Sequence, residues 1–205
     1  MKNQMTPTLS LILETDKIYC FFPLLQHGVM LQTRIGRSIR DMLCHGFGVS
    51  PEYLENRIET IFLNGKPVDD AGSAIVRDGS VLALSAAMPG LVGSTFRKGG
   101  HLAAFRSTIT HPKEEADVPV YKGVFILKLF NLLVRELGPV FLKRGVWIRK
   151  NELEAFLRRQ SEIFQAECKA VKKDGKEIKP EKLHEVSWSD EHEIVQLIVN
   201  STSDR

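Results

Sequence analysis

Basic and aromatic side chains alternate along one stretch of the chain, and together they could hold a nucleic acid. Residues 143–182 contain 12 Lys/Arg and 7 Asp/Glu, with Trp147 and Phe156 among them. Lysine and arginine neutralise phosphates, and aromatic rings stack on bases. The candidate anion or nucleic-acid residues are Arg144, Arg149, Lys150, Arg158 and Arg159. The alternative is a solvated helix face followed by a lysine-rich turn, and the lack of an RNA-binding signature favours this alternative.

Histidines and carboxylates cluster near the end of the sequence. The cluster comprises His184, Glu185, Asp190, Glu191, His192 and Glu193. Such side chains bind divalent metals, but the spacing of the two histidines does not match a pair of ligands on one helix. We therefore expect a solvated loop and predict no metal site.

The cysteines offer a second chemistry, because Cys44 precedes His45 and an imidazolium lowers the pKa of a nearby thiol. Adjacent residues on a helix do not face each other, so we expect Cys44 to be structural. The other two cysteines, Cys20 and Cys168, form no CxxC pair. Neither a disulfide framework nor a zinc ribbon is indicated, and reduced thiols are expected in a cytoplasmic protein.

The composition is that of an ordinary globular protein. The chain has 205 residues, of which 43% are hydrophobic, and a formal net charge of +3, too small by itself to indicate nucleic acid. Its most apolar run, residues 123–134, contains Lys128 and is shorter than the roughly 20 residues of a membrane span. The sequence has no P-loop, GxGxxG or GxSxG motif. We predict no membrane segment, catalytic residue or cofactor, and a cytoplasmic location.

The first ninety residues predict an α+β arrangement. Apolar residues 8–14 are expected to form a strand, paired as a hairpin with a second strand at 27–36. A helix is expected over 37–47, and Ser50 before Pro51 predicts the start of another. Further strands and turns are expected at 59–70, around Asn64-Gly65, and at 74–84, around Asp78-Gly79. The order β-β-α-β-β-β predicts a β-grasp, or ubiquitin-like, mixed sheet with one main helix.

Residues 8–93 resemble the sulfur-carrier family that includes the molybdopterin synthase small subunit and the thiamine sulfur carrier. The resemblance rests on RSIRDML, LNGKPVDD, IVRDGSVLAL and AAMPGLVG. It implies a surface for a protein partner, an adenylyltransferase-like enzyme in that family, formed by Met88, Pro89, Gly90, Leu91, Val92 and Gly93. The family needs a free Gly-Gly carboxylate, whereas this chain continues past Leu91, Val92 and Gly93. The carrier reaction therefore cannot take place there.

A second pair of glycines, Gly99-Gly100, follows Arg97 and Lys98 and resembles the tail of ubiquitin-like proteins. Cleavage after Gly100 would expose a carrier tail. The alternative, which the sequence favours, is a turn before a strand at 101–110. An exposed loop at 111–119 follows, so residues 94–119 are expected to link two domains.

Residues 120–205 predict a smaller C-terminal α+β domain. A mostly apolar helix is expected over 122–137, buried in an interdomain core or in a homodimer. Asn151 and Glu154 resemble a capping box that begins another helix. Strands are expected at 145–148, 183–188 and 193–199, and a hairpin at 168–178 with Asp174-Gly175 at its turn.

Three functions follow from these patterns. The sequence favours a non-catalytic binding or scaffold protein on a sulfur-carrier-like β-grasp fold, with residues 1–93 as that domain. The first alternative is a sulfur-carrier precursor cleaved after Gly100. The second is an RNA-binding accessory protein that uses the basic C-terminal half.

Overall fold

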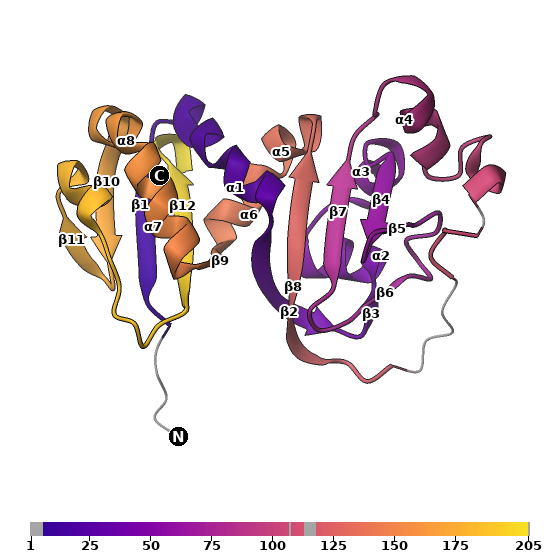
Figure 1. Ribbon diagram of the computed structural model, residues 1–205, viewed down its shortest axis with the longest axis horizontal. Helices are drawn as coiled ribbons and strands as arrows, with labels where there is room; N and C mark the ends of the chain where they lie inside the picture. Colours follow the sequence, from indigo (N-terminus) through magenta and orange to yellow (C-terminus); the bar gives the residue numbers. More distant parts are fainter. Residues whose placement is uncertain (1–5, 107, 113–117, 205) are drawn as a thin grey trace. The chain divides into compact units, whose positions relative to one another are not determined.

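The computed structural model describes residues 6–106, 108–112 and 118–204, and they form two compact units (Figure 1). Unit 1 combines Met1–Leu24 with Leu137–Arg205, and unit 2 is Leu25–Glu136. Both contain helices and mixed sheet, so the predicted α+β class is confirmed. The division does not follow the expected segments 1–93, 94–119 and 120–205, because the first strand belongs with the C-terminal part of the chain.

Unit 2 contains strands in the order β2, β8, β7, β4, β5. Their bounds are Val29–Ile35, Tyr121–Phe130, Val81–Ser85, Thr60–Leu63 and Lys66–Pro67. The pair β7–β8 is parallel, and the pairs β2–β8, β4–β7 and β4–β5 are antiparallel. A parallel pair thus has an antiparallel neighbour on each side. A separate two-stranded sheet joins β3 (Arg37–Ser38) to β6 (Ile75–Val76).

The helix expected over 122–137 is wrong. Most of this range lies in strand β8, and only α5 (Leu132–Glu136) is helical. Phe125, Leu127 and Leu129 are fully buried and alternate with more exposed residues. Alternation of this kind is the period of a strand with one buried face. The polar positions that suggested a helix include Lys128, which lies on the less buried face of β8, and Asn131, which follows the strand.

Two helices of unit 2 begin near the positions that the sequence predicts. In α2 (Ile39–Asp41), which continues into the π-helix η2 (Met42–Gly46), the hydroxyl of Ser38 accepts a hydrogen bond from the Asp41 N–H at 3.1 Å. In α3 (Pro51–Asn56), Ser50 accepts from the Tyr53 N–H at 3.1 Å. These are N-caps, which satisfy donors that a helix start leaves free. Buried residues of these helices include Ile39, Met42, Leu43 and Leu54.

Two of the expected turns have the required geometry. Asn64 and Gly65 have φ of 51° and 78°, and they join the antiparallel strands β4 and β5. Asp174 and Gly175 have φ of 49° and 78° between β10 and β11. Both angles are positive, as tight hairpins of this type require.

Unit 1 contains strands in the order β11, β10, β1, β12, β9. Their bounds are Lys176–Ile178, Cys168–Lys173, Thr8–Leu13, Ile194–Ser201 and Val146–Arg149. Strand β1 pairs antiparallel with β10 and parallel with β12. The hairpin expected between residues 8–14 and 27–36 is therefore wrong. Between β1 and β2 the chain forms the 3-10 helix η1 (Thr15–Phe21) and α1 (Phe22–His27) instead.

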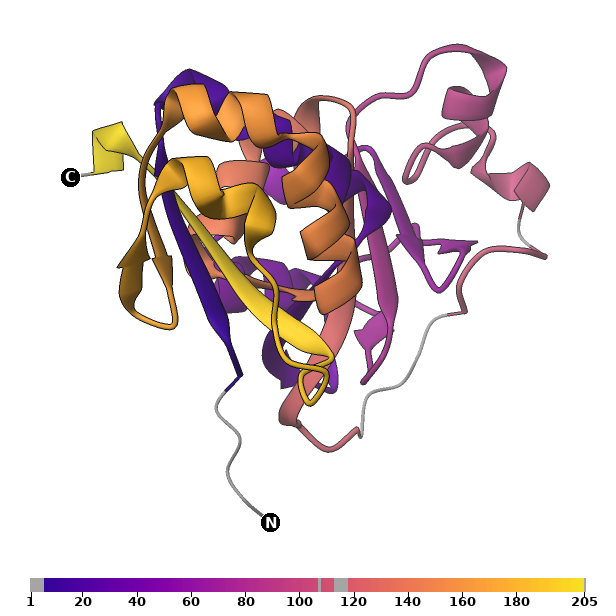
Figure 2. The ribbon, with the colours of Figure 1, turned by 60° about the vertical axis from the view of Figure 1, so that its left-hand side comes forward.

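Helices cover the sheet of unit 1. They are α6 (Gly138–Arg144), α7 (Lys150–Arg159), α8 (Ser161–Glu167) and the 3-10 helix η4 (Pro180–Glu185). A last 3-10 helix, η5 (Thr202–Asp204), follows β12. Figure 2 shows α7 and α8, in orange, lying across one face of the sheet. The rings of Phe21, Phe156 and Phe164 meet beneath them, with centroids 5.4–5.9 Å apart.

Two further expectations in unit 1 are wrong. The N-cap of α7 is Arg149, and the Glu154 carboxylate accepts from the Trp188 N–H at 3.1 Å, so Asn151 and Glu154 form no capping box. Residues 183–188 are not a strand, because η4 occupies Pro180–Glu185. Across the described residues of both units, no helix is long and apolar enough to cross a membrane.

Candidate functional site

The chain between β7 and β8 contains most of the residues that the sequence singled out in unit 2. We call its described residues 88–106 and 108–112 the outer segment. It contains α4 (Gly90–Phe96) and the 3-10 helix η3 (Ala103–Arg106), and η3 lies where a strand was expected at 101–110. Gly93 is buried in α4, and a Cβ there would lie 1.8 Å from the Met88 carbonyl oxygen. The start of the segment therefore requires glycine at this position.

Arg106 attaches the outer segment to Asp69, in the loop that follows β5. Its side chain is 2% exposed and donates to both carboxylate oxygens of Asp69, at 2.6 and 3.1 Å. It also donates to the carbonyl oxygens of Thr95 and Arg97, at 2.7 and 3.1 Å, and to the Thr110 hydroxyl at 2.9 Å. A buried guanidinium is tolerated when its donors are used in this way. Arg106 therefore has a structural role.

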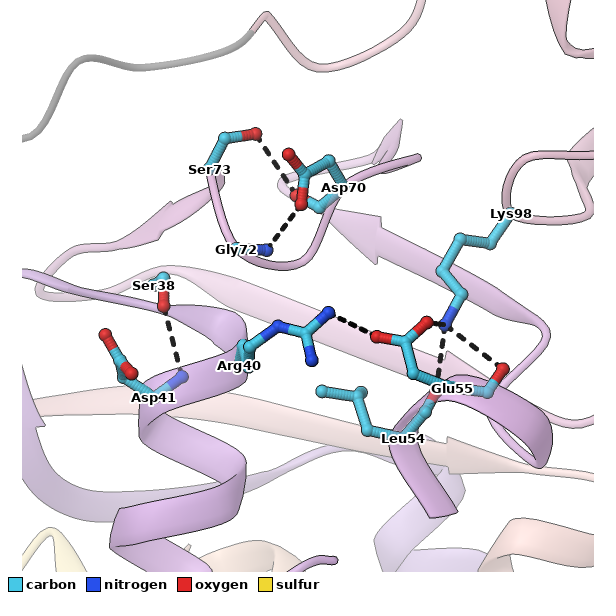
Figure 3. Close-up of polar contacts among 9 residues, drawn as sticks. All are labelled: Ser38, Arg40, Asp41, Leu54, Glu55, Asp70, Gly72, Ser73 and Lys98. Atoms are coloured by element: carbon cyan, nitrogen blue, oxygen red, sulfur yellow. Dashed lines mark hydrogen bonds and ion pairs between the residues drawn. The ribbon is translucent and has the colours of Figure 1, made fainter. Parts of the chain in front are cut away.

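Lys98 makes the second attachment (Figure 3). Its ammonium donates to the Leu54 carbonyl oxygen at 2.9 Å and lies 3.3 Å from the Glu55 carboxylate. The cation therefore meets the C-terminal turn of α3, where the helix dipole favours positive charge. Arg40 pairs with the same carboxylate from α2. Burial opposes ionisation of Glu55, but Lys98 and Arg40 outweigh it and lower the pKa of this carboxyl.

Gly99 and Gly100 lie in a turn that is bonded to the body of unit 2. The Gly99 N–H donates to the Asp69 carboxylate at 3.0 Å. The Gly100 N–H donates to the Arg97 carbonyl at 3.1 Å, and the Gly100 carbonyl accepts from Ala103 at 2.9 Å. Gly99 has a positive φ of 62°, as a turn residue often does.

Two cations of the outer segment, Lys98 and Arg106, are largely buried, whereas Arg97 and several large apolar side chains are exposed. Leu91, Val92, Phe105 and Ile109 are 76%, 64%, 84% and 50% exposed, while the Lys98 side chain is 11% exposed. Within the expected partner surface, Leu91 and Val92 point outward and Gly93 is buried. Large exposed apolar side chains beside buried charges are the reverse of an ordinary surface. The sequence does not predict this distribution, because it depends on which basic residues pair with Glu55 and Asp69 in the folded chain.

The five basic residues of unit 1 come from separate places. Arg144 ends α6, Arg149 ends β9, and the other three lie at the two ends of α7. A ten-residue helix is about 15 Å long, so Lys150 is far from Arg158 and Arg159. Lys150 pairs with Asp190 at 2.6 Å, and Arg158 lies 3.5 Å from Glu154. Lys150 and Arg158 therefore each have a carboxylate neighbour.

The remaining candidates are the His/carboxylate cluster and the cysteines. In the part of the chain that is described, no group of three or more His, Cys, Asp or Glu side chains could hold a metal ion. Burial raises the pKa of Cys44, the opposite of an activated thiol, and His45 Nδ1 lies 3.5 Å from the Asp41 carboxylate. Burial also raises the pKa of Cys20, to about 12.

Comparison with protein-family models, curated proteins and solved structures gives no match to this chain.

Proposed function

We propose that the protein is a non-catalytic binding protein and that its outer segment contacts a protein partner. The observation that carries this proposal is the reversed polarity of the segment. Leu91, Val92 and Phe105 face outward, while Lys98 and Arg106 are used internally. Exposed apolar groups are characteristic of interaction sites. The internal use of Lys98 and Arg106 leaves fewer cations for phosphates, which favours a protein surface over a nucleic acid.

The strand arrangement of unit 2 supports a β-grasp domain as the scaffold. A β-grasp sheet has a central parallel pair with an antiparallel neighbour on each side and a helix across one face. Strands β8 and β7 correspond to the parallel pair, β2 to the neighbour of β8, and β4–β5 to the hairpin beside β7. In this correspondence β8 takes the place of the first strand of a β-grasp fold. Since β8 is the last strand of unit 2 along the chain, the domain would be circularly permuted. The outer segment is the connection that a permuted order needs.

Under this proposal the outer segment corresponds to the tail of a sulfur carrier but has lost the carrier function. A carrier tail must be free to enter an enzyme channel, whereas Gly99 and Gly100 are held by Asp69 and by bonds within their own turn. The surface beside the tail would remain as a binding surface.

Site-specific photo-cross-linking tests the proposal. A photoreactive amino acid at Leu91 or Phe105 should give one discrete adduct in the native host cells. The same residue at Lys122, an exposed position near the start of β8, is the control. An adduct of twice the chain mass would identify a homodimer. The proposal fails if positions 91 and 105 give no adduct, or give the same adducts as position 122.

The intact mass from native cells separates the alternatives. The binding proposal requires a species that is not cut after Gly100. A fragment ending at Gly100 would favour a carrier precursor with an adenylyltransferase-like partner. Nucleic acid that dissociates at high salt would favour the RNA-binding alternative, since phosphate contacts are sensitive to salt.

A further inference from the structure

A small groove opens on the sheet of unit 2, on residues other than the exposed apolar ones of the outer segment. It has a volume of about 250 Å³ and an almost entirely apolar lining. The residues that line it are Thr60, Phe62, Ala83, Leu84, Ser85, Met88 and Phe130. This volume lies just below the roughly 300 Å³ at which drug-sized pockets begin. The groove therefore suits a single small ring.

The depth of the groove can be read from the exposure of its residues. Thr60 and Ser85 are 1% and 5% exposed and form the floor, whereas Phe130 is 37% exposed and lies at the rim. Thr60 and Phe62 are two residues apart on β4, so both face the groove, away from Ile61 and Leu63. The floor residue Ser85 lies opposite Thr60 in the register of β4 and β7.

The floor contains one hydroxyl that lacks a partner. Thr60 Oγ1 is buried and has no hydrogen-bond partner among the described residues. Its neighbour Ser85 does have one, because Asn131 Nδ2 donates to Ser85 Oγ at 2.8 Å. An unpaired buried hydroxyl is costly, whereas a ligand that bonds to it recovers that cost.

We propose that the groove binds a phenol: a small aromatic ring with one hydroxyl at its tip. The aromatic side chains of Phe62 and Phe130 would contact the ring. The polar group must be at the tip, because the available hydroxyl is on the floor. A threonine hydroxyl can both donate to and accept from a phenolic O–H. The phenol comes either from a free small molecule or from a tyrosine side chain of a protein.

The test is a titration of the full-length protein followed by methyl NMR of Thr60, Ala83 and Met88. The probe is 4-methylphenol, and toluene is its analogue without the hydroxyl. We expect all three methyl signals to shift with 4-methylphenol and toluene to bind roughly five- to tenfold more weakly, the worth of one hydrogen bond. Thr60→Val should abolish this preference, and Thr60→Ser should keep it. Thr33→Val, on β2 and outside the groove, is the matched control.

The outcomes decide both the site and the source of the phenol. Equal binding of the two probes, no shift at the three methyls, or a preference that survives in Thr60→Val would overturn the proposal. Tighter binding of N-acetyltyrosinamide than of 4-methylphenol would identify a tyrosine of a protein, and weaker binding a free phenol. Because Leu91 and Phe105 do not line the groove, failure here leaves the cross-linking result unaffected.

Discussion

Two side chains of unit 2 depart from the usual distribution of polar groups, and they do so in opposite ways. Arg106 is buried and its guanidinium donates hydrogen bonds from every nitrogen. The buried Thr60 hydroxyl, by contrast, has no hydrogen-bond partner in the described part of the chain. The first stabilises the outer segment, and the second costs stability in the absence of a ligand. Substitution should therefore have opposite effects at the two positions.

Replacing Arg106 by methionine should lower the free energy of unfolding by about 3 kcal/mol, because Asp69 then loses its buried counter-charge. Urea denaturation measures this loss. Arg97→Met is the control, because Arg97 pairs with Glu59 at the surface and should cost less than about 1 kcal/mol. Equal losses for both variants would mean that Arg106 does not hold the segment as described.

Replacing Thr60 by valine should instead raise the free energy of unfolding, by about 1 kcal/mol, because the shape is retained and an unpaired hydroxyl is removed. The urea midpoint should rise with an unchanged m-value. The corresponding change at Thr33 should stay within about 0.5 kcal/mol. A destabilised Thr60→Val variant would show that the hydroxyl is satisfied in solution.

At the scale of elements, local signals predicted more of the structure than long-range pairing did. Ser50 is expected to begin a helix and does cap α3, and Asn64-Gly65 forms its expected turn. These features depend on a few neighbouring residues. The pairing of the first strand depends on distant residues instead, because residues 8–13 pair with residues more than 150 positions away. The turn at Gly99-Gly100 was among the alternatives, but its attachment to Asp69 could not be read from the sequence.

The junction of α3 and α5 gives a pH-dependent prediction. Arg57 and Tyr53 on or next to α3 both donate to the Glu136 carboxylate of α5, and these bonds lower its pKa to about 2. The lowered pKa means that Glu136 stabilises the fold fully above its ordinary pKa of about 4.5 and loses this contribution as the pH falls toward 2.

Glu136→Gln should therefore be less stable than the wild type at pH 6, and the difference should shrink as the pH falls to 2.5. Urea midpoints of the two proteins, measured in parallel between these pH values, give the comparison. Other carboxyls titrate equally in both proteins and cancel in the difference. A difference independent of pH would show that Glu136 acts through packing and not through its charge.

At the scale of the whole molecule, the chain leaves unit 1 after its first strand, builds unit 2, and then returns to complete unit 1. Unit 1 depends on this return, because β1 lies between β10 and β12, and Leu9, Leu11 and Leu13 are fully buried. A first domain made of residues 1–93 alone would lack β8, the strand that pairs with both β2 and β7.

Hydrogen exchange distinguishes this organisation from a contiguous N-terminal domain. Leu11→Ala removes a fully buried side chain and should cost about 3 kcal/mol. The loss of protection should be greatest in β10 and β12, which pair directly with β1. Leu127→Ala, the same change on β8, should instead affect β2 and β7 most, as its own partners. If Leu11→Ala exposed β2 while β10 and β12 stayed protected, the first strand would belong with the segment that follows it, and the division into two units would be wrong.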